Sequence, residues 1–278
     1  MKLFRHGDAG AEKPGAVDPA GTLRDLSLLI EDFTPEWMAP ERLQALQAID
    51  LQRLPPLPPG RRLGTPVAGV RQFVAIGLNY RKHAAESGLE IPNEPVVFTK
   101  ALTSLAGPND DITLPDGSKT GDWEIELGFV IGSTARRVPI ERALTHVAGY
   151  CLANDVSERD WQIKRNGQWG KGKSFDGFGP IGPWLVTADE IGDPQSIPLR
   201  LAVNDTVRQQ SNTADMIFPV AQLVSYLSQF MTLLPGDLVI TGTPEGVGLG
   251  MKPPLFLKSG DVMTLDGGPL GTQRQRVR

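Results

Sequence analysis

The stretch Gly121-Asp122-Trp123-Glu124-Ile125-Glu126-Leu127-Gly128-Phe129-Val130-Ile131 contains two glutamates within an otherwise apolar run. In a β-strand, the side chains of residues i and i+2 lie on the same face. Glu124 and Glu126 are therefore expected to point in the same direction, while the apolar residues that alternate with them fill the opposite face. A solvent-facing strand with alternating acidic residues is the alternative interpretation.

A third carboxylate, Asp155, lies at the end of a second, mostly apolar stretch, Gly149–Val156. Like charges on a half-buried surface repel each other and lose hydration, and a divalent cation with oxygen ligands removes that cost. Three carboxylates without a nearby cysteine or histidine suit a hard cation, Mg²⁺ or Mn²⁺, better than Zn²⁺. The sequence thus favours a metal site made of Glu124, Glu126 and Asp155.

The composition indicates a turn-rich, mainly β protein, with 31 Gly and 24 Pro in 278 residues. A formal net charge of -4 with interspersed signs gives no basic patch, which argues against a nucleic acid partner. The single cysteine, Cys151, excludes an internal disulfide. No apolar run approaches the ~18 residues of a membrane helix. We therefore expect a cytoplasmic protein that acts on a small molecule and has no membrane partner.

The proline-rich segment Leu54–Gly60 can form neither a helix nor a central strand. It predicts a boundary between a small N-terminal domain, residues 1–65, and a larger domain, residues 66–278. Apolar residues at helical spacing predict one clear helix at Pro219–Met231. Few helices among many short strands favour an α+β fold that is mainly β, with mixed sheets. Strands are expected at residues 72–77, 96–100, 112–114, 123–131, 148–154, 182–186, 199–203 and 238–241.

His83 and Glu86 are three residues apart on a predicted helix at residues 79–86, hence on one face. A carboxylate that fixes the tautomer of a histidine lets the ring take a proton from water near neutral pH. The two residues are therefore candidates for water activation. An ordinary surface His/Glu pair is the alternative.

Arg159 and Gln162 are also three residues apart, and together they could bind a carboxylate or carbonyl, although a solvated helix cap would explain them as well. Residues Gly167–Ser174 match a phosphate-loop pattern. No apolar strand precedes this loop and prolines follow it, so we reject nucleotide binding and retain Lys173 as a cation that stabilises an oxyanion. The turn Thr241–Gly248 could hold a small carboxylate or be a plain tight turn.

Taken together, these motifs resemble the fumarylacetoacetate hydrolase family. The resemblance covers roughly residues 70–265 and keeps the order and spacing of six motifs. The motifs are Gly77–Tyr80 with His83 and Glu86, Pro95–Lys100, Asp122–Leu127, Asn154–Asp155 with Arg159 and Gln162, Gly172–Ser174, and Thr241–Gly248.

The resemblance implies a catalytic domain of mixed β-roll or barrel form at residues 66–278, usually in a homodimer. It also implies Mg²⁺ or Mn²⁺ held by Glu124, Glu126 and Asp155, a 2-oxo acid that chelates the metal, and cleavage of a carbon–carbon bond. The segments Gly107–Ile112 and Gly167–Trp169 are similar to a subgroup assigned to 2,4-diketo-3-deoxy sugar acids such as the rhamnonate and fuconate derivatives. Members of that subgroup are often labelled ureidoglycolate lyase.

We hypothesise that His83, oriented by Glu86, deprotonates a water that attacks the C4 carbonyl of a 2,4-dioxo acid. Cleavage of C3–C4 gives a hydroxy acid and the enolate of pyruvate, which Lys173 helps to stabilise. Alternative hypotheses are a ureidoglycolate lyase, an oxaloacetate decarboxylase, an acylpyruvate hydrolase or a non-catalytic, metal-stabilised binding protein. The residues expected to bind the substrate are Asn79, Tyr80, Arg159, Gln162 and Thr243.

Overall fold

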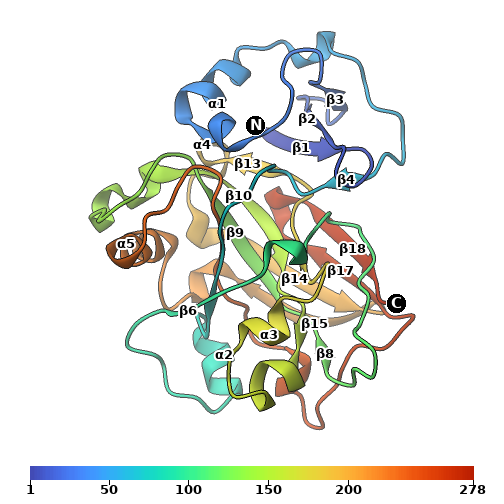
Figure 1. Ribbon diagram of the computed structural model, residues 1–278, viewed down its shortest axis with the longest axis vertical. Helices are drawn as coiled ribbons and strands as arrows, with labels where there is room; N and C mark the ends of the chain where they lie inside the picture. Colours follow the sequence, from blue (N-terminus) through green and yellow to red (C-terminus); the bar gives the residue numbers. More distant parts are fainter.

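A ten-stranded mixed sheet connects the N-terminal residues to the rest of the protein (Figure 1). The computed structural model describes all residues from Met1 to Arg278. The strand order is β3-β2-β1-β13-β10-β9-β16-β5-β6, and β4 also pairs with β1. These strands are β1 (Lys2–His6), β2 (Lys13–Val17), β3 (Leu23–Asp25), β4 (Leu63–Gly64), β5 (Phe73–Gly77), β6 (Val96–Thr99), β9 (Ile125–Ile131), β10 (Val147–Asn154), β13 (Leu185–Thr187) and β16 (Leu238–Ile240).

A four-stranded antiparallel sheet of order β15-β14-β17-β18 lies beside the large sheet. Two further strand pairs, β7 with β12 and β8 with β11, complete a fold that is α+β and mainly β, as the sequence predicted. These strands are β7 (Leu105–Ala106), β8 (Gly121–Asp122), β11 (Ser157–Glu158), β12 (Gly179–Pro180), β14 (Pro198–Val203), β15 (Thr206–Asn212), β17 (Val262–Asp266) and β18 (Thr272–Arg276).

The helices are few and short. The longest, α5, has 11 residues, and none has the length and apolar character of a membrane span. The α-helices are α1 (Pro40–Gln47), α2 (Arg81–Glu86), α3 (Gly170–Lys173), α4 (Ala188–Ile191) and α5 (Val220–Phe230). The 3-10 turns are η1 (Pro35–Met38), η2 (Leu51–Arg53), η3 (Leu102–Ser104), η4 (Ile140–His146), η6 (Pro194–Ser196), η7 (Thr213–Asp215), η8 (Gly248–Gly250) and η9 (Gly268–Leu270), and η5 (Asp160–Lys164) is a π-helical turn.

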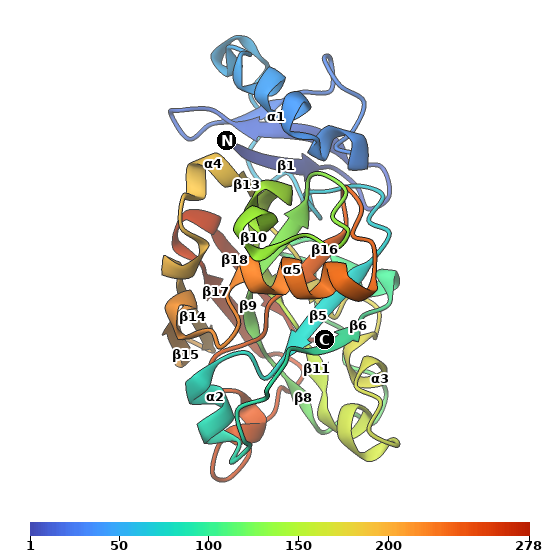
Figure 2. The same ribbon diagram turned by 90° about the vertical axis from the view of Figure 1, so that its left-hand side faces the viewer.

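The strands β9 and β10 are buried along their whole length. Strands covered on both faces read as nearly continuous apolar runs, and this explains their sequences. One hydrophobic cluster includes Phe129 and the buried face of α5, which Figure 2 shows lying across the sheet. The other cluster packs N-terminal residues such as Phe33 against Cys151. Cys151 is a buried free thiol, and burial raises its pKa to about 12.

The strand predicted at residues 112–114 is wrong. Ile112 makes a single parallel bridge with Val277, and the backbone bonds beside it reach only from Ile112 to Leu114, which is too short a segment for a ladder. The helix predicted at Pro219–Met231 is confirmed as α5. Residues 1–65 form the upper layer in Figure 1, and their strand β1 pairs directly with β13, so this layer continues the large sheet. A separate N-terminal domain stays a prediction.

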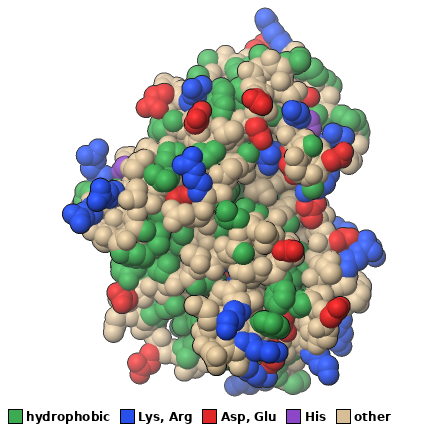
Figure 3. Space-filling view, viewed as in Figure 1, with side chains coloured by type: hydrophobic (Ala, Val, Ile, Leu, Met, Phe, Trp, Pro, Cys, Tyr) green, Lys and Arg blue, Asp and Glu red, His purple; other side chains and the backbone are tan.

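The surface shown in Figure 3 carries acidic and basic side chains spread between hydrophobic and neutral ones. This distribution agrees with the small net charge of the chain.

Asn79 connects three segments at the end of β5. Its side-chain amide donates to the carbonyls of Phe218 at 3.1 Å and Thr241 at 2.8 Å, and its oxygen accepts from the Phe218 N–H at 2.8 Å. Because these groups are buried, no water can replace the lost bonds if the amide is removed. Asn79 therefore fixes the end of β5 to the segments that precede α5 and follow β16.

We predict that Asn79→Ala lowers the free energy of unfolding by about 2 to 4 kcal/mol, because an unsatisfied buried polar group costs ~1–3 kcal/mol. Urea denaturation measures the change. Asn109→Ala is the control, since Asn109 is exposed and accepts a single bond from the Arg274 N–H. Equal midpoints for the two variants would contradict the structural role of Asn79.

Candidate active site

Antiparallel pairing of β9 with β10 brings together three carboxylates that are distant in the sequence. Glu126 lies opposite Ala153, and the Asp155 N–H donates to the Glu124 carbonyl at 2.8 Å. The start of one strand therefore lies beside the end of the other. Carboxylate oxygens of Glu124, Glu126 and Asp155, which we call the acidic triad, lie within 4.8 Å of one another. The strand spacing predicted this convergence, although β9 itself begins only at Ile125.

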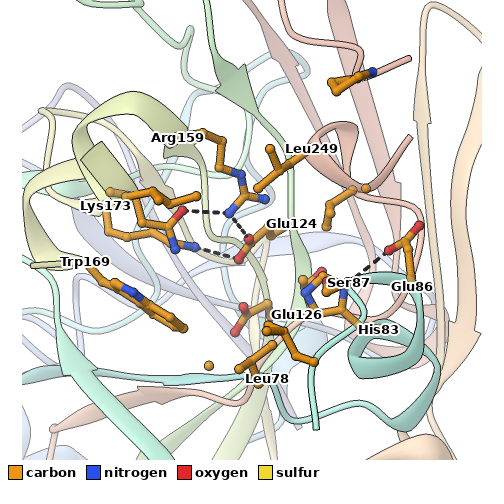
Figure 4. Close-up of a pocket in the computed structure, with 18 of the residues that line it drawn as sticks. Leu78, His83, Glu86, Ser87, Glu124, Glu126, Arg159, Trp169, Lys173 and Leu249 are labelled. Atoms are coloured by element: carbon orange, nitrogen blue, oxygen red, sulfur yellow. Dashed lines mark hydrogen bonds and ion pairs between the residues drawn. The ribbon is translucent and has the colours of Figure 1, made fainter. Parts of the chain in front are cut away.

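Three buried cations surround the acidic triad. Lys173 Nζ lies 2.7 Å from both Glu124 Oε2 and Asp155 Oδ2, and Lys100 Nζ lies 2.5 Å from Asp155 Oδ1. Arg159 contacts Glu124 Oε1 at 2.7 Å, and Figure 4 shows it and Lys173 converging on this carboxylate. Glu126 has no cationic partner and accepts a bond from the Gly242 N–H at 2.7 Å. Among the three carboxylates of the acidic triad, Glu126 is therefore the one without an ion pair.

The ionisation of the cluster follows from these contacts. Burial disfavours the charged form of Glu124, but Lys173 and Arg159 outweigh it and lower the pKa. Burial, together with repulsion by Asp155 and Glu124, raises the pKa of Glu126 well above its usual range. Burial opposes the charge of Lys173, yet Asp155 and Glu124 raise its pKa, whereas burial prevails and lowers the pKa of Lys100.

The acidic triad fits a divalent cation in its donor set and its charge. All three residues offer carboxylate oxygens, and no sulfur or nitrogen ligand takes part, which is the preference of Mg²⁺ and Mn²⁺. With Asp122 included, four carboxyl groups face three cations, so the cluster has one negative charge in excess when all four are ionised. A bound cation would remove the repulsion that acts on Glu126.

Asp122 and Lys100 belong to the cluster, and the sequence motifs gave neither a role. Asp122 contacts Arg159 at 2.8 Å and accepts from the N–H groups of Gly248 at 2.7 Å and Leu249 at 3.0 Å. It thereby ties the loop around η8 to the charged cluster. A single acid or lysine in a motif carries no pairing signal, so the structure was needed to show both contacts.

Close packing of α3 places Lys173 in the cluster. A Cβ atom at Gly172 would lie 2.4 Å from the Glu158 carbonyl oxygen and 2.7 Å from Gln162 Cβ. A larger residue would push α3 away from β11 and η5 and would withdraw the ammonium group from the acidic triad. The glycine that makes this segment resemble a phosphate loop therefore serves helix packing.

A cavity of about 490 Å³ opens onto the charged cluster. Its lining includes Glu124 and Glu126, together with six other site residues that the sequence predicted. Asn79 and Tyr80 are absent from it, because Asn79 binds backbone groups and the Tyr80 ring lies in the hydrophobic core. These two residues are not brought to the cavity with the other predicted substrate-binding residues. The polar lining residues are His83, Glu86, Ser87, Arg159, Gln162, Lys173, Thr243 and Lys252.

The predicted substrate-binding groups that do reach the cavity are partly committed to protein contacts. Arg159 donates to Gln162 Oε1 at 2.9 Å in addition to its two carboxylates. Thr243 Oγ1 donates to the Ile125 carbonyl and accepts from Gln209 Nε2. The amide nitrogen of Gln162 is the group that these contacts leave free for a ligand.

His83 and Glu86 lie on one face of α2, as their spacing predicted. His83 Nδ1 is 3.2 Å from Glu86 Oε2, and Figure 4 shows this contact at the side of the cavity. Glu86 also accepts from the Gly246 N–H at 3.0 Å, so its carboxylate is fixed from two directions. Leu78, with a φ of 51°, turns the chain from β5 towards α2. This left-handed conformation is uncommon for leucine and lies directly at the cavity.

Comparisons with known proteins agree with this architecture. The family described as fumarylacetoacetate (FAA) hydrolase C-terminal matches residues 72–278. A protein of Burkholderia cenocepacia (strain HI2424) with the name "putative hydrolase" is 54% identical over 279 residues, covering 100% of this chain and 99% of that protein. The chain belongs to the fumarylacetoacetate hydrolase family.

Two solved structures are similar over the whole chain. The maleylpyruvate hydrolase of Sphingobium sp. SYK-6, in complex with manganese(II) and pyruvate, has 29% identity and a TM-score of 0.83 and covers 100% of this chain and 98% of its own. The 5-carboxymethyl-2-hydroxymuconate delta-isomerase of Mycobacterium smegmatis has 34% identity and a TM-score of 0.78, with the same coverage. The family thus includes proteins named as hydrolases and as isomerases.

We predict that Asp122→Asn lowers the free energy of unfolding by roughly 3 kcal/mol, because it leaves the buried Arg159 guanidinium with an incomplete counter-charge. Urea denaturation tests this. Asp160→Asn removes only the exposed pair with Lys164 and should leave the midpoint almost unchanged. A native midpoint for Asp122→Asn would show that the cluster does not depend on this carboxylate.

Proposed function

We propose that this protein is a divalent-metal-dependent hydrolase that cleaves the C3–C4 bond of a 2,4-dioxo acid and releases pyruvate. The observation that carries the proposal is that Glu124, Glu126, Lys173 and the His83–Glu86 pair line one cavity, while Asp155 completes the acidic triad beside it. The relative with bound manganese(II) and pyruvate supports it. The ion is Mg²⁺ or Mn²⁺, held by Glu124, Glu126 and Asp155. When bound, it supplies Lewis-acid stabilisation of negative charge on the 2-oxo group.

His83 is the base of this mechanism. Because Nδ1 faces Glu86, the carboxylate holds the tautomer that carries its proton on Nδ1 and leaves Nε2 to accept one. Nε2 takes a proton from a water molecule, and the water oxygen adds to the C4 carbonyl. Gly246 keeps Glu86 in place through the bond to its backbone N–H. The His83–Glu86 pair therefore activates the water while Glu86 stays bound to the loop at Gly246.

Cleavage then separates the two halves of the substrate. The C3–C4 bond breaks, and its electron pair remains on the C3 side as the enolate of pyruvate, which receives at C3 the proton that His83 Nε2 took from water. The C4 side leaves as a carboxylic acid that contains the oxygen of water. Lys173 lies against Glu124 and Asp155, where its positive charge favours the enolate. In this mechanism, the Gln162 amide donates to the C4 carbonyl oxygen.

Recognition of the 2,4-dioxo acid head group does not determine which acyl group the substrate carries at C4. The deoxy sugar acids that the sequence suggested carry the same 2,4-dioxo head group, and so do simple acylpyruvates. We further propose that the protein works as a homodimer and meets its substrate as a free small molecule.

An isomerase is the second candidate, because one similar solved structure is named as an isomerase. An isomerase moves a proton and breaks no carbon–carbon bond, so it releases no pyruvate. Incubation of the protein with Mg²⁺ and 2,4-dioxopentanoate, followed by a pyruvate assay, separates the two. Pyruvate release supports the hydrolase, and its absence with a range of 2,4-dioxo acids would overturn it.

Removal of the metal should abolish activity. We predict that EDTA stops pyruvate release, that Mg²⁺ or Mn²⁺ restores it, and that Glu126→Gln lowers Mn²⁺ affinity at least tenfold because one anionic ligand is lost. Isothermal titration with Mn²⁺ measures the affinity. Asp237→Asn is the control, since Asp237 is a buried carboxyl outside the cavity. Unchanged Mn²⁺ affinity in Glu126→Gln would remove this residue from the ligand set.

His83→Ala should separate metal binding from hydrolysis. We predict a loss of kcat by a factor of about 10² to 10⁴, the usual contribution of general-base catalysis, with Mn²⁺ affinity kept within about twofold. Steady-state pyruvate release and Mn²⁺ titration of the same preparation provide the two readouts. Near-native hydrolysis by this variant would mean that another group activates the water.

A further inference from the structure

Apolar side chains form much of the cavity lining around the charged cluster. They come from the turn after β5, the loop after α2, the turn η5, the start of α3 and the turn η8. In Figure 4, the labelled members of this set surround the carboxylates. We call them the apolar wall: Leu78, Leu89, Ile163, Trp169, Leu249 and Met251.

Several residues of the apolar wall are unusually exposed for large hydrophobic side chains. Leu89 is 51% exposed, Ile163 is 50% exposed and Leu249 is 38% exposed, although all three line the same cavity. They lie on segments that are far apart in the sequence. Apolar surface that gathers in a concave site, rather than singly on the outside, is typical of a surface that contacts a ligand.

Trp169, one residue of the apolar wall, is packed firmly beside the reactive groups. The Trp169 indole packs so closely on Gly77 that a Cβ atom there would lie 2.3 Å from the ring. Its other neighbour, Phe98, meets it edge to face with ring centroids 5.6 Å apart. Trp169 precedes Lys173 by four residues on the same helical segment. A ligand whose head group reaches Lys173 therefore has its next carbons against this wall.

Few hydrogen-bonding side chains are available there. Thr243 Oγ1 and Gln162 Oε1 are already bonded within the protein. Beyond the charged cluster and the His83–Glu86 pair, Ser87 and Lys252 are the polar side chains that add to the Gln162 amide. Each hydroxyl of a polyhydroxylated chain would lose its hydration on entry and would need a partner to recover it. The cavity supplies few such partners and much hydrocarbon surface.

We propose that the group attached to C4 of the substrate is a plain hydrocarbon, alkyl or aryl, and that Leu249 and Ile163 select it. The substrate is then an acylpyruvate with an apolar acyl group, in place of the deoxy sugar acid suggested by the sequence. This inference rests on the proposed hydrolase function. It adds the class of acyl group and the residues that determine it.

A matched pair of substrates tests the selection directly. 2,4-Dioxohexanoate and 5-hydroxy-2,4-dioxohexanoate differ by one hydroxyl group, and we expect kcat/KM to be at least tenfold higher for the first. Along the unbranched series from 2,4-dioxopentanoate to 2,4-dioxononanoate, kcat/KM should rise up to about fourfold per methylene, the value that corresponds to burial of one CH₂ group. Pyruvate release measures all of these substrates.

Variants of the wall provide the second arm. Leu249→Ser and Ile163→Ser should each lower the ratio of kcat/KM for 2,4-dioxononanoate over 2,4-dioxopentanoate by at least fivefold. Leu144→Ser is the control, because Leu144 is 39% exposed, nearly the same as Leu249, yet lies on η4 and does not line the cavity. It should leave the ratio at the wild-type value.

The outcomes distinguish this inference from the function on which it rests. If pyruvate is released but the hydroxylated substrate is preferred, or the ratio does not depend on Leu249 and Ile163, the apolar selection is wrong and the hydrolase stands. If no 2,4-dioxo acid yields pyruvate in the presence of Mg²⁺, the proposed function is wrong and the inference fails with it.

Discussion

The site depends on one unfavourable interaction, the repulsion among carboxylates buried where β9 begins and β10 ends. Backbone pairing forces this proximity, because the Asp155 N–H binds the Glu124 carbonyl and the adjacent register places Glu126 opposite Ala153. Burial of like charges is costly unless cations or bound metal compensate them. The protein supplies three cations and still leaves Glu126 without one. We interpret the missing positive charge beside Glu126 as the position that a divalent ion would occupy.

Much of the surrounding structure serves to hold these charges in position. Asp122 fixes Arg159 and the loop around η8, and Glu86 fixes the loop at Gly246. Gln209 reaches from the second sheet to the Ile125 N–H and to Thr243, so the four-stranded sheet supports the start of β9. The cavity is therefore shaped by contacts between segments that are remote in the sequence.

Features that depend on local residue spacing could be predicted from the sequence. Features that depend on contacts between distant segments could not. Glu124 and Glu126 follow the two-residue period of a strand, and His83 and Glu86 follow the turn of a helix, so both pairs could be found without coordinates. Asn79 and Tyr80 were assigned to substrate binding because they lie in a family-like motif. Their burial against segments far along the chain, such as Phe218, could not be inferred from that motif. The apolar wall escaped prediction for the same reason, since its members come from separate loops and turns.

Anomalous X-ray diffraction from crystals of the protein grown with Mn²⁺ would locate a divalent cation bound by the acidic triad. We expect a single strong anomalous peak within coordination distance of carboxylate oxygens from Glu124, Glu126 and Asp155. A map with no peak at these residues, and with Lys173 and Arg159 still paired to Glu124, would contradict this expectation.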